Sequence, residues 1–199
     1  MHHDITVGAL IVFLRLPERG KVKTRLAEGL GPDEALRIYT LLTNHTLATA
    51  ARLARPVYLF YDGGLPEDKT ASFSYQIQGQ GDLGQKMMHA LSFVLRLHPK
   101  AVVIGSDCPG ITQGILMEAF SRLEEVDIVI GPATDGGYYL LGCKKIIPDL
   151  FHSIDWGTDA VLKQTMEKIR GTNLSWHFLP TLNDIDTAED WKTFQETKG

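Results

Sequence analysis

The fold is set by the stretch Ala101-Val102-Val103-Ile104-Gly105-Ser106-Asp107-Cys108-Pro109, an apolar run that passes directly into a polar turn. A run rich in β-branched residues and bounded by Gly and Pro predicts a buried strand. Ligands of open α/β sheets bind beyond the carboxyl ends of the strands. We therefore place the candidate active centre at Asp107. The alternative is a purely structural turn, since Asp is common before Pro-Gly.

The composition is that of an ordinary globular protein. The chain has 199 residues, of which 44% are hydrophobic and 22% charged, and no linker or charge block divides it. A chain of this length can bury one sizeable core, so we expect a single domain over residues 1–199. The net charge of -4 gives no electrostatic support for binding nucleic acid.

The cysteines and the apolar segments bear on where the protein works. Cys108 and Cys143 are the only cysteines, and they match no zinc-binding spacing. The apolar run 8–14 is too short to span a membrane and lacks the flanking features of an export signal. We therefore expect a cytoplasmic protein with no membrane span, and the sequence does not indicate its oligomeric state.

Apolar periodicity and turn residues predict alternating strands and helices. Strands are expected at 6–14, 56–61, 73–78, 101–104, 127–130, 138–142 and 174–179. Helices are expected at 32–53 and 159–170, and a further helix is expected to begin at 83. Another is expected to begin after a cap at Thr112 and to end at about 123. The last helix is expected to begin after a box-like cap formed by Thr187 and Asp190. The first strand is apolar nearly throughout, which is typical of a sheet with helices on both faces.

A basic loop follows the first predicted strand. Residues 15–25 contain five of the chain's 20 basic residues, namely Arg15, Arg19, Lys21, Lys23 and Arg25. Cations and backbone amides that converge in a Gly-containing loop suit a di- or triphosphate. The loop is not a Walker A motif, because the required glycine and hydroxyl spacings are absent. The alternative is a solvated surface loop without a ligand.

A second stretch favours a different ligand. Gly79-Gln80-Gly81-Asp82-Leu83-Gly84 spells G-x-G-x-x-G between a predicted strand and a predicted helix, and Asp107 follows at about the spacing of a ribose-binding acid. The pattern is that of a Rossmann-type oxidoreductase that binds NAD(P). However, the motif lies in mid-chain and leaves the basic loop 15–25 without a function. The oxidoreductase is therefore kept as an alternative.

Two further stretches combine carboxylates with turns. Asp135-Gly136-Gly137 follows a predicted strand, and its glycines let backbone amides approach a ligand while Asp135 accepts from hydroxyls. A plain hairpin is the alternative. Asp184 and Asp186 follow the last predicted strand, where the return of the chain can bring Asp186 close to Asp107.

Five blocks, taken in order, resemble the signature of a known family. They are Lys23-Thr24-Arg25-Leu26, Gly81-Asp82-Leu83-Gly84, Gly105-Ser106-Asp107-Cys108-Pro109, Gly131-Pro132-Ala133 with Asp135-Gly136-Gly137-Tyr138-Tyr139-Leu140-Leu141-Gly142, and Asp184-Ile185-Asp186-Thr187. The family is the glycosyltransferase-A-fold group of radical-SAM/selenodomain-associated transferases, distantly similar to 2-phospholactate guanylyltransferases and molybdenum-cofactor nucleotidyltransferases. The blocks extend over nearly the whole chain and are specific as a set.

The resemblance implies a fold and a nucleotide site. The implied fold is a single α/β nucleotide-diphospho-sugar transferase domain of the glycosyltransferase A type, in which helices flank a mixed, mainly parallel sheet. Arg15, Lys23 and Arg25 would hold phosphates, with Arg15 standing where relatives often have lysine. Gly81 and Gly84 would line the base or the ribose.

The resemblance also implies a metal and an acceptor side. Asp107 would be a ligand of Mg²⁺ or Mn²⁺, and Asp135, Gly136 and Gly137 would face the acceptor. We expect Asp186 to be the second ligand, because it follows the last predicted strand, where the return of the chain can bring it close to Asp107. One or two protein carboxylates beside substrate phosphates are enough for Mg²⁺.

The implied function is metal-dependent transfer from a nucleotide donor to a small-molecule acceptor. In nucleotidyl transfer from a nucleoside triphosphate the leaving group is pyrophosphate, and in glycosyl transfer from a nucleotide sugar it is a nucleoside diphosphate. Both are polyanions that a metal ion on Asp107, aided by Lys23 and Arg25, would stabilise. The donor and the acceptor stay open, and a non-catalytic nucleotide-binding regulatory protein is a further alternative.

Overall fold

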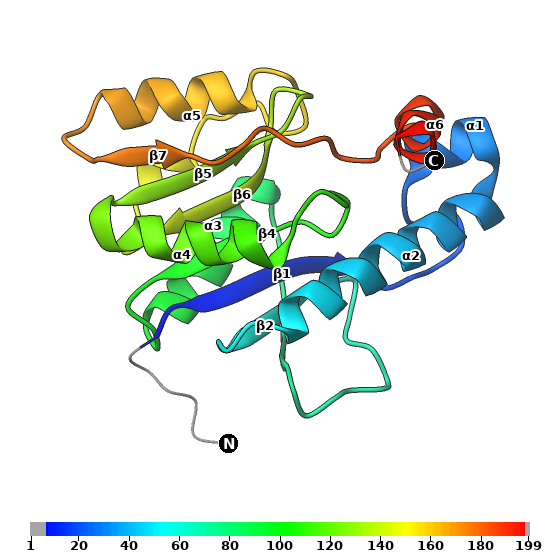
Figure 1. Ribbon diagram of the computed structural model, residues 1–199, viewed down its shortest axis with the longest axis horizontal. Coiled ribbons are helices and arrows are strands. Elements are labelled where there is room, and N and C mark those ends of the chain that lie inside the picture. The colour runs from blue at the N-terminus through cyan, green and yellow to red at the C-terminus, as the bar shows by residue number, and fades with distance from the viewer. Residues whose placement is uncertain (1–6, 198–199) are drawn as a thin grey trace.

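The computed structural model describes residues 7–197, and its central feature is a sheet covered by helices (Figure 1). Within these residues the sheet has seven strands in the order β3-β2-β1-β4-β6-β5-β7. Their bounds are β1 Ala9–Arg15, β2 Val57–Asp62, β3 Ser74–Ile77, β4 Ala101–Ile104, β5 Ile128–Pro132, β6 Tyr138–Cys143 and β7 Trp176–Phe178. Strand β6 is antiparallel to β4 and β5, and the other neighbouring pairs are parallel. The predicted mixed, mainly parallel sheet is confirmed.

The helices lie on both faces of this sheet. Their bounds are α1 Thr24–Leu30, α2 Pro32–Ala51, α3 Leu83–Leu95, α4 Gln113–Glu125, the short 3-10 helix η1 Pro148–Leu150, α5 Val161–Arg170 and α6 Ala188–Glu196. Helices α2 and α4 pack on one face and α3 and α5 on the other. Figure 1 shows α4 in front of the strands and α3 behind them. The result is a three-layer α/β/α arrangement.

Strand β1 shows why this chain needs two covering layers. Successive side chains of a strand point to opposite faces of the sheet. Leu10 and Val12 enter the core beneath α2 and α4, whereas Ala9 and Ile11 enter the core beneath α3. All four are 0% exposed. A strand that is buried on both faces has no polar alternation, which explains the continuous apolar run in the sequence.

A smaller satellite core lies beyond the edge of the sheet. Helices α1 and α6 lie side by side at one end of the molecule (Figure 1), and their side chains Leu26 and Trp191 pack with Ile38 of α2. Ile185, which precedes α6, is also buried in this cluster. The satellite core therefore anchors two distant segments of the chain, the basic loop 15–25 and the acidic stretch 183–187.

The predicted helix caps at Thr112 and Thr187 are confirmed. The side chain of Thr112 accepts a hydrogen bond from the backbone N–H of Ile115 at the start of α4. Thr187 and Asp190 form a reciprocal capping box at the start of α6. Such bonds satisfy backbone donors that a helix terminus leaves without partners. Local sequence chemistry therefore fixed where these helices begin.

Three features of the fold differ from the predictions. Helix α1 was not predicted, because its seven residues are too few to display a helical apolar period. It ends at Gly31, whose φ of +83° only glycine adopts readily, and Pro32 then opens α2. Helix α5 begins at residue 161 instead of 159, and η1 was missed. The predicted start of the first strand at Thr6 lies outside the described residues.

Among residues 7–197, no helix combines the length and apolarity that crossing a bilayer requires.

Candidate active site

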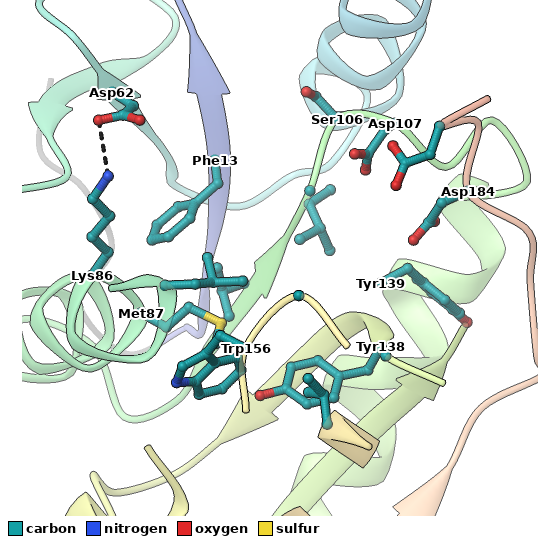
Figure 2. A pocket seen from close by; sticks show the side chains of 18 of the residues that line it. Phe13, Asp62, Lys86, Met87, Ser106, Asp107, Tyr138, Tyr139, Trp156 and Asp184 are labelled. Carbon is teal, nitrogen blue, oxygen red and sulfur yellow. Dashed lines mark hydrogen bonds and ion pairs between the residues drawn. The ribbon is translucent and has the colours of Figure 1, made fainter. Parts of the chain in front are cut away.

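Most of the predicted site residues gather at one edge of the sheet, beyond the carboxyl ends of β1 and β4. A cavity of about 760 Å³ opens there. The predicted residues that line it are Arg15, Lys23, Arg25, Gly81, Asp107, Asp135, Gly137 and Asp186. Figure 2 shows the carboxylates of Asp107 and Asp184 on one side of this cavity and Met87 and Trp156 on the other.

Asp107 is positioned by β4 and by the segment that precedes α6. Strand β4 is buried at every position and delivers the chain into the turn that carries Asp107. The backbone oxygen of Asp107 accepts a hydrogen bond of 2.9 Å from the backbone N–H of Ile185. Ile185 is 1% exposed in the satellite core, so Asp184 and Asp186 on either side of it reach the cavity. This alternation brings three carboxylates from two distant segments together.

Lys23 lies between two of these carboxylates. Its Nζ is 2.9 Å from Oδ2 of Asp107 and 2.6 Å from Oδ1 of Asp186, and its side chain is only 8% exposed. Burial acts against the ammonium charge, but the attraction of the two carboxylates outweighs it and raises the pKa of Lys23. Two other basic residues of the loop, Arg19 and Lys21, instead form ion pairs away from the cavity.

The two arginines of the predicted phosphate site are more exposed. The guanidinium of Arg25 is 3.7 Å from Oδ2 of Asp186, and its side chain is 67% exposed. Arg15 ends β1 and lies 3.4 Å from Asp62, with 61% of its side chain exposed. Asp62 also accepts a 2.9 Å hydrogen bond from Lys86 of α3, drawn in Figure 2. Because surface ion pairs of this kind are weak, both guanidinium groups can turn toward an anion in the cavity.

Asp184 has an unusual environment for a carboxylate. Burial, followed by repulsion from Asp107 and Asp135, raises the pKa of Asp184 to about 7. The neighbouring thiol of Cys108 is buried as well, and burial followed by the charge of Asp184 raises its pKa. Asp184 therefore exists in both protonation states near neutral pH.

The raised pKa of Asp184 predicts a pH-dependent stability. The folded protein holds this proton up to about pH 7, whereas an unfolded Asp loses it near pH ~4. Stability from this group is thus fully present below pH ~4 and is lost as the pH rises through about 7. In metal-free buffer, Asp184→Asn should raise the free energy of unfolding by on the order of 3–4 kcal/mol at pH ~8 and leave it nearly unchanged at pH ~4, where the unfolded carboxyl is also protonated about half of the time.

Denaturant unfolding of both proteins at the two pH values measures this difference. The Asn side chain keeps the shape of a neutral carboxyl, so a change of packing would affect both pH values equally. An equal shift at both would contradict a role for the ionised carboxylate.

The G-x-G-x-x-G stretch serves the start of α3. Gly81 has a φ of +107°, and a Cβ there would lie 2.1 Å from the Oε1 of Gln85, which completes the capping box with Asp82. At Gly84 a Cβ would lie 2.5 Å from the indole of Trp156. Gly81 lines the cavity, whereas Trp156 covers Gly84. The motif also follows β3 at the edge of the sheet, not β1, so the topology does not support the Rossmann alternative.

Gln78, just before this motif, was not predicted as a site residue. Its side-chain nitrogen donates hydrogen bonds to the backbone oxygens of Leu14 and Phe60 at 3.1 and 3.0 Å, which fixes the orientation of the amide. Gln78 lines the cavity, and its Oε1 accepts no hydrogen bond from the residues that the structure describes. The Oε1 is thus an acceptor of fixed orientation that has no donor among these residues. The only sequence signal was a polar residue at the end of an otherwise half-buried strand.

The Asp135-Gly136-Gly137 stretch forms the tight turn between β5 and β6. Asp135 accepts a 2.9 Å hydrogen bond from the backbone N–H of Gly137, and both residues line the cavity. Gly136 has a φ of +89° and packs against the backbone of Asp159, whose oxygen would lie 2.2 Å from an added Cβ. Its own carbonyl accepts a 2.8 Å bond from Leu162 of α5. The close backbone approach at Gly136 is therefore made by the chain itself.

An aromatic and apolar wall faces the carboxylates. This wall of the cavity is formed by Phe13, Met87, Tyr138 and Trp156 (Figure 2). The rings of Tyr138 and Trp156 meet edge to face with centroids 6.3 Å apart. The indole nitrogen of Trp156 is buried and has no hydrogen-bond partner within residues 7–197. Sequence patterns did not identify this wall, because its members come from four separate segments of the chain.

The oxygen donors at this edge fit a divalent cation. Oxygens of Asp107 and Asp186 both lie within 2.9 Å of a single atom, the Nζ of Lys23, so the two carboxylates converge on one point. Within the described part of the chain, no group of three or more His, Cys, Asp or Glu side chains is arranged to hold a metal. Mg²⁺ commonly takes one or two carboxylates and completes its shell with water and phosphate. The pair therefore suits Mg²⁺ or Mn²⁺, provided that Lys23 withdraws.

Comparison with known proteins places the chain in a family. The family model described as "Uncharacterized protein conserved in bacteria (DUF2064)" matches residues 45–158, which is more than half of the chain. This range contains Gly81, Asp107 and Asp135 and ends before Asp186. No curated protein sequence gave a significant match.

Solved structures with the same fold include one clear relative. A protein of Desulfovibrio desulfuricans G20, provisionally called a nucleotide-diphospho-sugar transferase, is 33% identical, covers 97% of this chain and 88% of its own, and superposes with a TM-score of 0.91. The inositol-1-phosphate CTP transferase of T. maritima is 12% identical over 98% of this chain and 96% of its own, with a TM-score of 0.61.

A third structure was determined with a metal. The Rv0371c protein of Mycobacterium tuberculosis H37Rv, in complex with manganese, is 14% identical over 96% of this chain and 100% of its own, with a TM-score of 0.60. At such low identity, the T. maritima and M. tuberculosis proteins establish the shared fold alone.

Proposed function

The chain belongs to the DUF2064 family, and from this starting point we propose that it is a metal-dependent transferase that uses a nucleotide donor and a small-molecule acceptor. Within that class we propose the radical-SAM/selenodomain-associated group as its closer relatives. The observation that carries the proposal is the convergence of Lys23, Arg25, Asp107 and Asp186 around one cavity at the edge of the sheet. A cavity of about 760 Å³ is of the size that holds a nucleotide.

The cationic side chains would bind the phosphates of the donor. Lys23 supplies a buried ammonium, and Arg15 and Arg25 supply exposed guanidinium groups that can form paired bonds to phosphate oxygens. As the leaving group departs with growing negative charge, these donors would stabilise it. Lys23 and Arg25 are therefore the proposed catalytic cations.

Asp107 and Asp186 would hold Mg²⁺ or Mn²⁺. When bound, such an ion supplies Lewis-acid stabilisation of phosphate oxygens. The hydrogen bond between the backbones of Asp107 and Ile185 sets the separation of the two carboxylates before any ligand arrives. Preorganisation of this kind reduces the cost of assembling the site on binding.

The donor's base or ribose would lie at the start of α3. Gly81 opens that wall of the cavity, Gly84 lets Trp156 pack closely beside it, and the fixed Oε1 of Gln78 can accept from a base N–H. The acceptor would lie at the turn between β5 and β6, where Asp135 can accept from a hydroxyl and Gly137 lines the cavity. Gly136 would serve there by holding the turn against α5.

The transfer can take two chemical forms. In nucleotidyl transfer, an acceptor oxygen attacks the α-phosphorus and the bond to pyrophosphate breaks. In glycosyl transfer, an acceptor oxygen attacks the anomeric carbon and the bond to a nucleoside diphosphate breaks. Both expel a polyanion toward the same cations, so the geometry of Lys23 and Arg25 serves either reaction.

A ligand panel tests this function directly. We expect nucleoside triphosphates or nucleotide sugars to raise the melting temperature only when Mg²⁺ or Mn²⁺ is present, because the metal and the phosphates complete each other's binding. Thermal shift measurements should compare these ligands and NAD(P)H with and without metal.

Two results would redirect the interpretation. A rise in melting temperature with NADH alone, in the absence of metal, would favour the oxidoreductase alternative. Metal-dependent binding of a nucleotide with no turnover against a broad set of phosphate and hydroxyl acceptors would favour the regulatory protein.

A further inference from the structure

The position of Lys23 raises a question about how a metal ion reaches its site. The Nζ of Lys23 lies 2.9 Å from Asp107 and 2.6 Å from Asp186. These are the oxygens at which a divalent cation would bind. The ammonium group and the metal ion cannot occupy the same point, and their like charges repel at short range.

The backbone that carries the ammonium group is held firmly in this position. The side chain of Lys23 is 8% exposed, and Val22 beside it is 1% exposed. Lys23 adopts a left-handed conformation with a φ of +47° at the start of α1, which is uncommon for a residue with a Cβ. Its carbonyl accepts a 2.9 Å hydrogen bond from Ala27. Strained conformations of this kind persist where surrounding contacts fix them.

Within residues 7–197, no second cation lies as close to both carboxylates. Arg25 is 3.7 Å from Asp186 and is mostly exposed. With Lys23 removed, Asp107 and Asp186 would face each other and the nearby Asp184 without a close counter-ion. The ammonium of Lys23 therefore balances the charge of these carboxylates.

We propose that Lys23 is an exchangeable counter-ion, whose ammonium occupies the divalent-cation position until the polyphosphate of a nucleotide draws it away. This inference rests on the proposed function. Phosphate oxygens offer the ammonium new charge-assisted partners, and its departure frees both carboxylates for the metal. Metal and nucleotide therefore bind as a coupled pair, each strengthening the other. The protein alone binds divalent cations weakly.

The test is a direct measurement of Mn²⁺ binding without nucleotide, by electron paramagnetic resonance of the free ion. Lys23→Met keeps the length of the side chain and removes its charge. Because a positive charge leaves a partly dry site, we expect Mn²⁺ affinity to rise about tenfold or more over the wild type. Lys21→Met is the matched control, since Lys21 pairs with Glu18 away from the cavity, and it should bind Mn²⁺ as the wild type does.

Two further variants make the result specific. Lys23→Gln should show the same gain and serves if Lys23→Met folds poorly, with circular dichroism as the check on folding. Lys23→Met combined with Asp186→Asn should lose the gain, because one of the two ligands is then neutral.

The inference and the proposed function fail in distinguishable ways. If neither charge-removing variant binds Mn²⁺ more tightly than the wild type while nucleotides still bind with metal, the counter-ion inference is overturned and the proposed function stands. If the variants gain the Mn²⁺ site but no nucleotide binds to the wild type, the exchange of Lys23 for a metal is supported and the proposed function fails.

Discussion

Asp107→Asn is expected to abolish metal-dependent nucleotide binding while leaving the fold intact. The substitution keeps the size of the side chain and removes the charge that pairs with Lys23 and that would hold the metal. We expect the loss of affinity to exceed the roughly 10–100-fold that removal of an outer-shell partner of a metal ligand costs. Calorimetric titration of a nucleotide in the presence of Mg²⁺ measures the effect, and circular dichroism confirms the fold.

The neighbouring carboxylates provide the controls for this prediction. Asp186→Asn should weaken binding partially, because Asp107 can still hold the metal together with phosphate. Asp184→Asn should have the smallest effect, since Asp184 is largely buried beside Cys108 and near neutral pH carries its proton part of the time. Loss of binding in Asp184→Asn with a silent Asp186→Asn would make Asp184 the second ligand. If Asp107→Asn binds the nucleotide with metal as tightly as the wild type, Asp107 is not a ligand of the metal and the proposed site is wrong.

Gly136→Ala is expected to cause the largest loss of stability among the site glycines. An added Cβ would lie 2.2 Å from the oxygen and 2.6 Å from the Cα of Asp159, and backbone atoms cannot move aside as a side chain can. The φ of +89° adds strain for any residue with a Cβ. Together, overpacking and strain should lower the free energy of unfolding by about 2–5 kcal/mol. At roughly 2–4 °C per kcal/mol, the melting temperature should fall by about 5–15 °C.

Gly157→Ala is the matched control for this variant. Gly157 has a similar φ of +82°, but a Cβ there would meet nothing within 4 Å. It should therefore show the backbone strain alone, a loss of about 1–2 kcal/mol. If the two variants lose equal stability, contact with Asp159 contributes nothing. In that case the glycine at 136 would be free to serve a ligand, as its place after β5 first suggested.

The sequence predicted most of the sheet and the residue at its centre. The run from Ala101 to Ile104 is apolar because β4 is buried on both faces, and the chain must then turn out at Gly105 into the cavity. Helix caps such as Thr112 were also predictable, because they depend on bonds between residues only three positions apart. Patterns of this kind are local, so a single chain displays them without any knowledge of its partners.

The partners within the site were decided by the tertiary structure. Lys23 was expected to meet phosphates, but in the structure it meets Asp107 and Asp186, which are 84 and 163 residues away in the chain. Helix α1 forms around Leu26 because α2 and α6 cover that side chain. A helix of seven residues has little stability of its own and depends on such packing.

The aromatic wall and the satellite core also depend on contacts between segments that are far apart in the sequence. Phe13, Met87, Tyr138 and Trp156 come from four segments, and nothing in the spacing of any one segment reveals that they share a cavity. Asp184 and Asp186 reach the cavity beside Asp107 because Ile185, which lies between them, is buried by side chains of α1, α2 and α6. The sequence by itself determined the strands, the caps and the residue types at the sheet edge, since these follow from periodicity and local hydrogen bonding. Only long-range packing could decide which charges meet, because ion pairing depends on distances that close when the core forms.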